Sequence, residues 1–355
     1  MMMLRLLNNK HFAYSLKTKR SSQHRIISIN GEISDLVQKE EMMNKYIYIN
    51  RIEFSITNAC TSRCKHCSVG NTLSSDKSSV DREKAMSVIL ELAKLYPIES
   101  VMTFGGEPLL YADTVCAIHK TATDNGIHKR QVITNGYFSK DIKKITAAAK
   151  ALKESGVNSL LLSVDAFHKE HIPLEQVYLF AKELCNEKLD GFKLHPAWVI
   201  DREHDNCYNK ETEECLNYFS DLDITVSKGN NIFPAGNAAI YLSEFYEKKT
   251  IDLSVKCGEA PYTAKLDNIE TIAINPNGDV IVCCFVIGNV YKESITEIIE
   301  RYNPYENPVM STLLHSGVNA LVGLAERKGI RIDISQYYSA CSVCREIVER
   351  LNHTK

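Results

Sequence analysis

The sequence has no long hydrophobic run and no excess of charge of one sign. Its longest apolar stretch, VIVCCFVIG, covers residues 280–288, far short of the ~20 residues that a membrane-spanning helix needs. Lysine and arginine number 42 against 44 aspartates and glutamates, for a formal net charge of −2, so no overall positive field points to nucleic acid. We therefore expect no membrane span and no nucleic-acid partner.

The start of the chain lacks the apolar segment of a secretory signal. Residues 1–31 contain lysines and arginines but no acidic residue, which gives them a faint likeness to a transit peptide. A solvated basic extension is the simpler interpretation, and we expect a cytoplasmic protein. Thiols stay reduced in that compartment, so the twelve cysteines are expected to bind metal rather than to form disulfides.

Hydrophobic patterning predicts an α/β protein. Nearly continuous apolar strands are expected at residues 46–57, 98–104, 130–136, 158–164, 192–200 and 223–227. Amphipathic helices are expected between them or just before the last of them, at residues 81–95, 112–123, 142–155, 174–186 and 212–219. This alternation is typical of a parallel sheet covered by helices. Right-handed crossovers make a partial (β/α)6 TIM-like barrel the simplest closure, with a doubly wound sheet as the alternative.

Two hairpin signals lie outside the expected barrel. Asn30-Gly31 and Asn277-Gly278 each stand between alternating apolar residues, the strongest short-range signal for a tight β-turn. Helices are expected after the second hairpin, at residues 295–301 and 310–327. The chain is therefore expected to have three parts: an N-terminal extension at residues 1–48, the barrel at residues 49–250 and a small α+β domain at residues 251–355.

Three cysteines follow the first expected strand, in the stretch ACTSRCKHCSVG. Cys60, Cys64 and Cys67 would lie at the carboxyl-terminal mouth, where barrel active sites assemble. A structural zinc ion needs four ligands, whereas a [4Fe–4S] cluster held by three thiolates keeps one iron free for a substrate. A zinc site with a distant fourth ligand is the alternative.

This spacing, C-x3-C-x2-C, resembles the signature of the radical S-adenosylmethionine (SAM) superfamily. The second expected strand ends in Gly105-Gly106-Glu107-Pro108, which is similar to the G-G-E-P motif of that superfamily, although it also suits a plain turn before a helix. The resemblance implies that SAM binds to the free iron and that Glu107 accepts hydrogen bonds from its ammonium group. It also implies an electron donor such as flavodoxin or ferredoxin.

Four further residues are assigned to SAM by the same resemblance. Asn135, Ser163 and Asp165 are candidates for its ribose and methionyl carboxylate, and His66 occupies the position that packs beside adenine in the superfamily. Asn135 and Asp165 also suit turns or helix caps.

The C-terminal cysteines form a second set. Cys257, Cys283, Cys341 and Cys344 are spaced C-x25-C-x57-C-x2-C, and four thiolates suit either zinc or a closed [4Fe–4S] cluster. The layout resembles the shortened "twitch" form of the SPASM domains found on radical SAM enzymes, although its first gap is longer than usual. That resemblance implies an auxiliary [4Fe–4S] cluster, and hence two such clusters in the protein.

Cys284 directly follows Cys283 in an expected strand, so the two side chains should face opposite sides. Cys284 is then either a buried apolar residue or a thiol aimed into the barrel. A Cys-Cys pair of this kind is similar to that of radical SAM peptide epimerases, in which the second cysteine donates a hydrogen atom.

Those enzymes also carry a Ser-x-Asp-x-aromatic-His stretch, present here as residues 163–168, but they have an aspartate where this chain has Thr271. The resemblance implies that the substrate is a ribosomally made peptide, and that an L-residue of this peptide is epimerised with Cys284 as the hydrogen donor. Cys207 is the second candidate for the hydrogen donor. A radical SAM dehydrogenase or cross-linking enzyme is the alternative within enzymes, and a non-catalytic iron–sulfur or zinc protein is the alternative outside them.

One other polar group suggests metal binding. Asp165, His168 and His171 lie close together in the sequence and contain metal-ligating side chains. We interpret them as a polar loop at the barrel mouth, with a metal site as the alternative.

Overall fold

The computed structural model describes residues 44–70, 77–259 and 265–353. The N-terminal basic segment and the hairpin expected at Asn30-Gly31 lie outside the described residues. The described residues fall within one compact unit that starts at Asn44.

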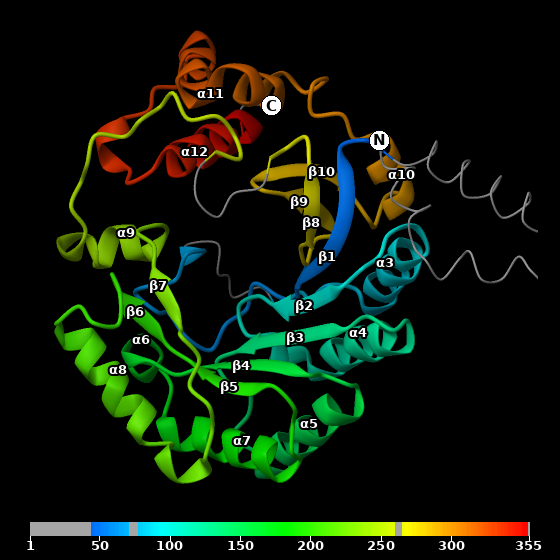
Figure 1. The fold of residues 1–355 in the computed structure, drawn as a ribbon, viewed down its shortest axis with the longest axis vertical. Helices are drawn as coiled ribbons and strands as arrows, with labels where there is room; N and C mark the ends of the chain where they lie inside the picture. Colours follow the sequence, from blue (N-terminus) through cyan, green and yellow to red (C-terminus); the bar gives the residue numbers. More distant parts are fainter. Residues whose placement is uncertain (1–43, 71–76, 260–264, 354–355) are drawn as a thin grey trace, which may run out of the picture. The chain divides into compact units, whose positions relative to one another are not determined.

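A parallel sheet forms the centre of the fold, as the patterning predicts (Figure 1). Its parallel strands pair in register from one neighbour to the next, and an antiparallel hairpin extends it at one end. The sheet order is β10-β9-β8-β1-β2-β3-β4-β5. The strands are β1 (Ile47–Ser55), β2 (Ser100–Phe104), β3 (Lys129–Thr134), β4 (Ser159–Ser163), β5 (Phe192–His195), β8 (Ile269–Ile274), β9 (Asp279–Val282) and β10 (Phe285–Asn289).

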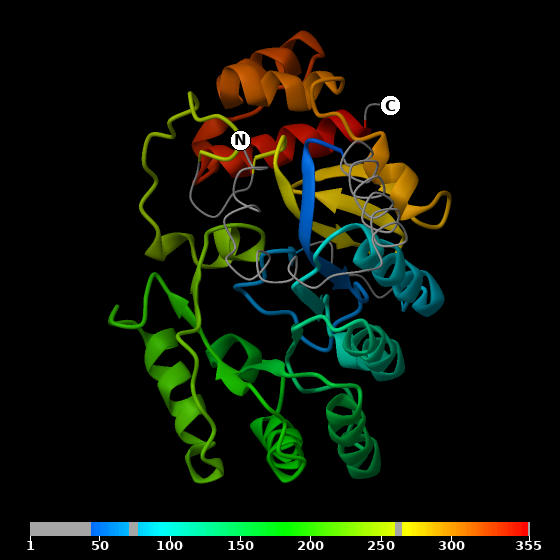
Figure 2. The ribbon, with the colours of Figure 1, turned by 45° about the vertical axis from the view of Figure 1, so that its right-hand side comes forward.

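Amphipathic helices cover the outer side of strands β2 to β5 (Figures 1 and 2). Asp81 and Asp141 accept backbone hydrogen bonds at the starts of two of them, which satisfies N–H groups that a helix leaves unpaired. Each helix turns its buried stripe towards the sheet. These helices are α3 (Arg82–Leu95), α4 (Ala112–Asp124), α5 (Ile142–Glu154) and α7 (Leu174–Asn186), and α8 (Cys207–Asn217) follows β6 (Ala197–Val199).

The expected sixth strand is wrong. Residues 223–227 contribute only one isolated bridge, from Val226 to Leu194 of β5. The next strand is β7 (Asn230–Ile232), which pairs with β6 in a separate two-stranded sheet. Pro196 lies between β5 and β6, where it cannot donate to a ladder. The expected helix at 212–219 begins earlier, at Cys207, because the side chain of Asn206 caps it.

The second hairpin signal is confirmed. Asn275 to Gly278 connect β8 to β9, with Gly278 at a φ of 84°, a conformation that glycine adopts without strain. The hairpin does not stand apart from the barrel, because β8 pairs with β1 in parallel. The described C-terminal helices are α10 (Ile295–Glu300), α11 (Pro308–Arg327) and α12 (Ala340–His353).

Cys283 and Cys284 do not lie in a strand, contrary to the expectation. Val282 pairs with Phe285, so the two cysteines form the two-residue turn between β9 and β10. Cys283 has a φ of 54°, as the tight hairpin turns of this length require. The expected placement of their side chains on opposite sides of a strand is therefore wrong.

Helix α11 is the one described helix that is long and apolar enough, by length and composition alone, to cross a membrane. Gly317 interrupts it with a φ of 75° and a ψ of −172°, leaving two pieces of about ten residues where a span needs about twenty. Several of its apolar residues, including Leu313 and Leu321, are buried, and α11 packs against α12. These features are those of a core helix.

Candidate active site

Four loops meet at the carboxyl ends of β1 to β4, as they do in barrel enzymes. The loop after β1 carries Cys60, Cys64 and Cys67, and the loop after β2 carries the Gly-Gly-Glu-Pro stretch. Asn135 follows β3, and Asp165 follows β4. The structure therefore places the sequence-predicted SAM residues on neighbouring strand ends.

The Gly-Gly-Glu-Pro loop lies directly on the cysteine loop. Gly106 donates its N–H to Thr57 O at 2.7 Å, and Glu107 donates its N–H to Ala59 O at 2.8 Å. A Cβ atom at Gly106 would lie 2.0 Å from Ala59 O and 3.1 Å from Cys60 Cβ. Any side chain at position 106 would force the two loops apart.

A third loop holds the cysteine loop from the side of α9 (Asn237–Tyr241). Asn237 donates its backbone N–H to Cys67 O at 3.0 Å and its side-chain N–H to Cys64 O at 3.1 Å. A Cβ atom at Gly236 would lie 2.7 Å from Cys67 O. Hydrophobic patterning does not predict these contacts, because they join residues about 170 positions apart.

The three thiols of the cysteine loop fit an iron–sulfur cluster. The Ser62 hydroxyl lies 2.8 Å from Cys64 Sγ, and Asn135 Nδ2 donates to Cys60 Sγ at 3.7 Å, contacts that suit ligating sulfurs. Burial raises the pKa of Cys60 to about 11. Three soft sulfur ligands on one loop suit iron–sulfur chemistry with an open coordination position.

Glu107 is completely buried between the ends of β2 and β3. Its carboxylate accepts hydrogen bonds from Leu109 N at 2.9 Å, Thr134 Oγ1 at 2.6 Å and Asn135 N at 2.8 Å. Burial raises its pKa to about 6 against the opposing effect of these bonds. A carboxylate has about four acceptor positions, so Glu107 keeps one for an ammonium group.

We expect Glu107→Ala to weaken SAM binding by about tenfold to a hundredfold, since a hydrogen bond to a charged group contributes about 1.5–3 kcal/mol. Iron content should not change, because Glu107 is not a cluster ligand. Equilibrium binding of SAM to reconstituted protein measures the effect. Thr134→Val is the control: it removes one donor to Glu107 and leaves the carboxylate. Full SAM affinity in Glu107→Ala would show that the motif is misplaced.

Asn135 and Asp165 have the turn and cap roles that the sequence also allows. Asn135 Oδ1 accepts from Tyr137 N at 2.9 Å, while its Nδ2 donates to Thr61 Oγ1 at 3.1 Å. Asp165 caps the short helix α6 (Ala166–Lys169) by accepting from His168 N at 3.0 Å. Ser163 ends β4 opposite His195. The side chains of Asn135 and Asp165 are thereby held at the ends of β3 and β4.

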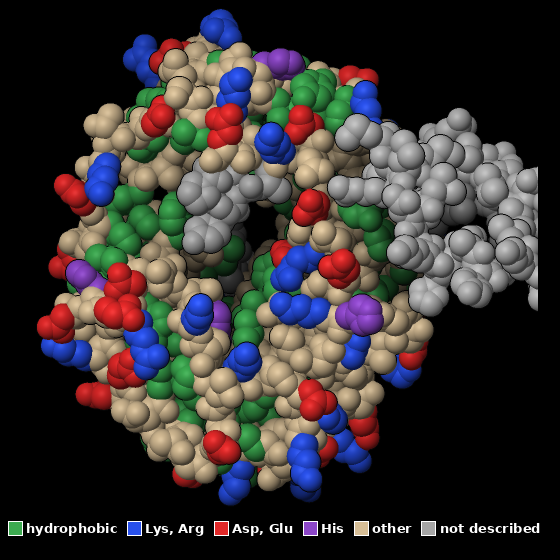
Figure 3. Space-filling model, in the orientation of Figure 1, with side chains coloured by type: hydrophobic (Ala, Val, Ile, Leu, Met, Phe, Trp, Pro, Cys, Tyr) green, Lys and Arg blue, Asp and Glu red, His purple; other side chains and the backbone are tan. Residues whose placement is uncertain are grey.

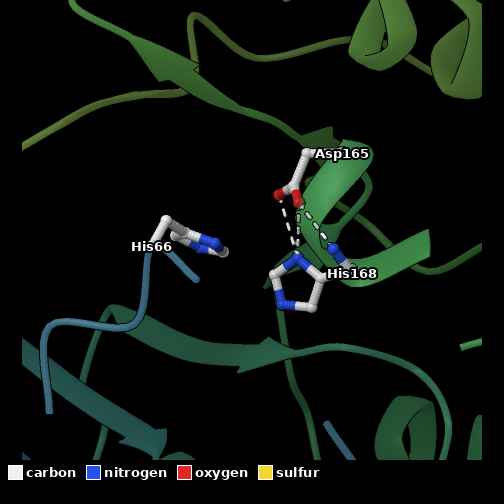
Figure 4. A group of neighbouring side chains, drawn as sticks. All are labelled: His66, Asp165 and His168. Atoms are coloured by element: carbon white, nitrogen blue, oxygen red, sulfur yellow. Dashed lines mark hydrogen bonds and ion pairs between the residues drawn. The ribbon is translucent and has the colours of Figure 1, made fainter. Parts of the chain in front are cut away.

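His66, Asp165 and His168 form one polar group (Figure 4), with one ligand atom from each lying within 4.8 Å of the others. His168 Nδ1 lies 2.9 Å from both carboxylate oxygens of Asp165. Burial opposes this ion pair, but the charge of His168 outweighs it and lowers the pKa of Asp165 to about 2. Burial likewise opposes the charged form of His168, whose pKa the Asp165 carboxylate nevertheless raises well above its usual value.

His66 replaces His171 in the group that the sequence suggested. His171 Nε2 lies 4.0 Å from Glu170 instead, whereas His66 enters from the cysteine loop (Figure 4). The His66 Nδ1 atom is buried and has no hydrogen-bond partner among the described residues, and burial lowers the pKa of His66 to about 4. A neutral ring with a free nitrogen suits contact with a bound ligand.

The C-terminal cysteines come together at the turn between β9 and β10. Burial raises the pKa of Cys257 to about 11, with further contributions from Cys283 and Cys341. Contact with Cys284 and burial raise the pKa of Cys283. The pKa of Cys284 is also raised: its contact with Cys283 acts in the opposite direction, but contact with Cys344 and burial outweigh it. Five thiols therefore gather where a cluster needs four.

Comparison with protein families gives two matches. Residues 54–237 match the Radical SAM superfamily, and residues 268–345 match the iron–sulfur cluster-binding domain called SPASM. The first match contains the cysteine loop and the Gly-Gly-Glu-Pro loop, and the second contains four of the five C-terminal cysteines. Together they confirm the cofactors expected from the sequence, SAM and two iron–sulfur clusters.

Curated relatives match part of the chain. A GTP 3',8-cyclase of Limosilactobacillus fermentum is 28% identical over 216 residues, which cover 57% of this chain and 58% of that protein. A GTP 3',8-cyclase of Lactiplantibacillus plantarum is 31% identical over 119 residues, which cover 33% of each. The chain thus spans between one third and three fifths of the length of these relatives.

Solved structures share the fold over most of the chain. Streptococcus suis SuiB bound to S-adenosylmethionine has a TM-score of 0.51 at 12% identity, covering 97% of this chain and 88% of that one. SuiB bound to the precursor peptide SuiA has a TM-score of 0.50 at 14% identity, covering 96% and 87%. At this identity the likeness concerns the fold, and it confirms the α/β barrel core with a small C-terminal domain.

Proposed function

The chain belongs to the radical SAM superfamily, and on that premise we propose that it inverts an L-residue in a ribosomally made peptide. The observation that carries this proposal is the surplus thiol: five cysteines gather at the β9–β10 turn. Four of them suffice for a cluster. The fifth is free to act on a substrate.

The proposed reaction uses residues at two sites, the cysteine loop and the turn that contains Cys284. Cys60, Cys64 and Cys67 would hold the first cluster, and Glu107 and His66 would lie against SAM. Bound together, these cofactors would supply the radical chemistry that takes the α-hydrogen from the substrate. Cys284 donates its thiol hydrogen to the opposite face of the planar α-carbon, which inverts the residue. The sulfur radical left on Cys284 takes up one electron and one proton, and a flavodoxin or ferredoxin is the expected electron source.

A nucleotide substrate is the second candidate, favoured by the curated relatives, which are named GTP 3',8-cyclase. Oxidation or cross-linking of a peptide is a third outcome, in which the substrate loses two electrons and no thiol hydrogen is transferred. The surplus thiol favours epimerisation over both, because neither of the other reactions uses it.

Solvent deuterium distinguishes these reactions. We expect reconstituted protein with SAM, reductant and a peptide substrate to place one deuterium at the inverted α-carbon in heavy water, because a thiol proton exchanges with solvent. Mass spectrometry and chiral amino-acid analysis measure the product. A product oxidised by two electrons and free of solvent deuterium would overturn the proposal, as would turnover of GTP alone.

A further inference from the structure

A cavity of about 650 Å³ opens at the amino-terminal ends of β3, β4 and β5, away from the strand ends that carry the SAM residues. Its volume is in the range of small-molecule and peptide side-chain sites. Three lysines line it, Lys129, Lys193 and Lys228, here called the cavity lysines. Figure 3 shows Lys, Arg and His side chains gathered around the middle of one face of the protein.

The cavity reaches into the barrel, whose lumen is polar. A closed TIM barrel is normally filled with valine, isoleucine and leucine, whereas Gln131, Ser159 and His195 line this cavity. Behind them, Arg51 Nη2 lies 3.5 Å from Gln131 Oε1 and Arg51 Nε lies 2.6 Å from Glu53. A lumen of this kind accommodates water and polar ligands rather than packing shut.

The positive charge of the cavity is not compensated. No aspartate or glutamate lines it, and none of the cavity lysines has a carboxylate of a described residue within ion-pair distance. The whole chain has a net charge of −2, so this local excess is not a reflection of overall composition. Like charges in a concave site raise the local concentration of anions.

The cavity also leads towards the SAM residues. His195 lines it, and its backbone pairs with Ser163, two residues before Asp165. The lining of the cavity therefore reaches the carboxyl end of β5, beside the end of β4 that precedes Asp165.

The cavity lysines come from separate segments of the chain and suit several dispersed negative charges. Lys129 is on β3 and Lys193 on β5, with β4 between them, so their backbones are about 10 Å apart or more. Carboxylates on alternate residues of an extended peptide are about 7 Å apart, a separation that suits dispersed lysines.

We propose that the cavity binds an acidic segment of the peptide substrate, with its carboxylates on Lys129, Lys193 and Lys228, while a residue further along the peptide reaches the SAM site. The idea that the ligand is the substrate rests on the proposed function. The anion site itself rests on the cavity alone.

Binding of a fluorescein-labelled octaglutamate peptide to the reconstituted full chain tests this site, with an octaglutamine peptide for comparison. The cavity variant carries Lys129→Glu, Lys193→Glu and Lys228→Glu. The control variant makes the same charge change on the outer helices, with Lys143→Glu, Lys144→Glu and Lys182→Glu, at exposed positions. A neutral variant with Lys129→Gln, Lys193→Gln and Lys228→Gln shows whether a loss of binding comes from the missing lysine charge or from misfolding caused by charge reversal.

We expect the octaglutamate peptide to bind wild type and control variant alike, and to lose at least about tenfold in affinity in the cavity and neutral variants. Octaglutamine should bind weakly to all four proteins. SAM cleavage without peptide should equal wild type in every variant, since no cavity lysine is assigned to SAM.

Equal losses in the control and cavity variants would overturn the proposal, because binding would then follow total charge. Displacement of octaglutamate by GTP at lower concentration than by free glutamate peptide would also overturn it, in favour of a nucleotide site. The readout does not depend on epimerisation. Loss of octaglutamate binding restricted to the cavity variants supports the site even where the deuterium experiment contradicts the reaction.

Discussion

Cys284→Ala is expected to abolish epimer formation while the protein keeps both clusters and still cleaves SAM. The physical reason is that a planar α-carbon radical becomes a D-residue only when a donor on its second face gives it a hydrogen atom. Epimer yield should fall by at least about a hundredfold, a loss of the size seen when a reacting group is removed. Chiral analysis of the product measures the loss, and electron paramagnetic resonance should detect a persistent substrate radical.

Cys283→Ala is the matched control, because it changes the neighbouring residue in the same turn. It should lower the iron content and leave Cys284 in place. The contact between Cys284 and Cys344 makes the opposite assignment a clear alternative. Iron loss in Cys284→Ala, with Cys283→Ala the milder change, would make Cys284 a cluster ligand and Cys283 the surplus thiol.

Simultaneous replacement of Cys60, Cys64 and Cys67 by alanine should eliminate SAM cleavage. Reconstituted wild type is expected to hold about eight irons in two [4Fe–4S] clusters, and the triple variant about four. Iron and sulfide analysis measures the first effect, and formation of 5′-deoxyadenosine measures the second.

Three cysteines outside both sites supply the control. Cys116 and Cys185 lie in α4 and α7, and Cys207 begins α8, so Cys116→Ala, Cys185→Ala and Cys207→Ala together should keep about eight irons and full SAM cleavage. One zinc and four irons in the wild type would show that the C-terminal cysteines bind zinc and not an auxiliary [4Fe–4S] cluster. Unchanged iron content in the variant without Cys60, Cys64 and Cys67 would show that these cysteines do not bind a cluster.

The elements predicted well from the sequence are those with strong local signals. The helix expected at 174–186 has those bounds in the structure, because thirteen residues carry an amphipathic pattern that only a helix satisfies. Asp81 and Asp141, next to their helices, cap them as such residues do. The motifs at the strand ends are also predicted well, because each follows a clear strand and the strand order alone brings them together.

The errors come from non-local effects and from an atypical turn. The stretch VIVCCFVIG resembles one apolar strand, and cysteine is not a typical turn residue, so nothing local marks the turn at Cys283-Cys284. The strand at 230–232 depends on a partner about 30 residues away, not on its own hydrophobicity. His66 joins Asp165 and His168 through the meeting of two loops, which no spacing along the chain encodes.

Because β8 pairs with β1, the sheet is completed only late in synthesis of the chain. Ile47 pairs with Ile269, so the ribosome releases every strand from β1 to β5 before the second neighbour of β1 exists. In the nascent barrel β1 is an open edge whose unpaired N–H and C=O groups favour aggregation. A chain halted before residue 269 should therefore depend on chaperones, and that dependence should fall once residues 269–274 emerge.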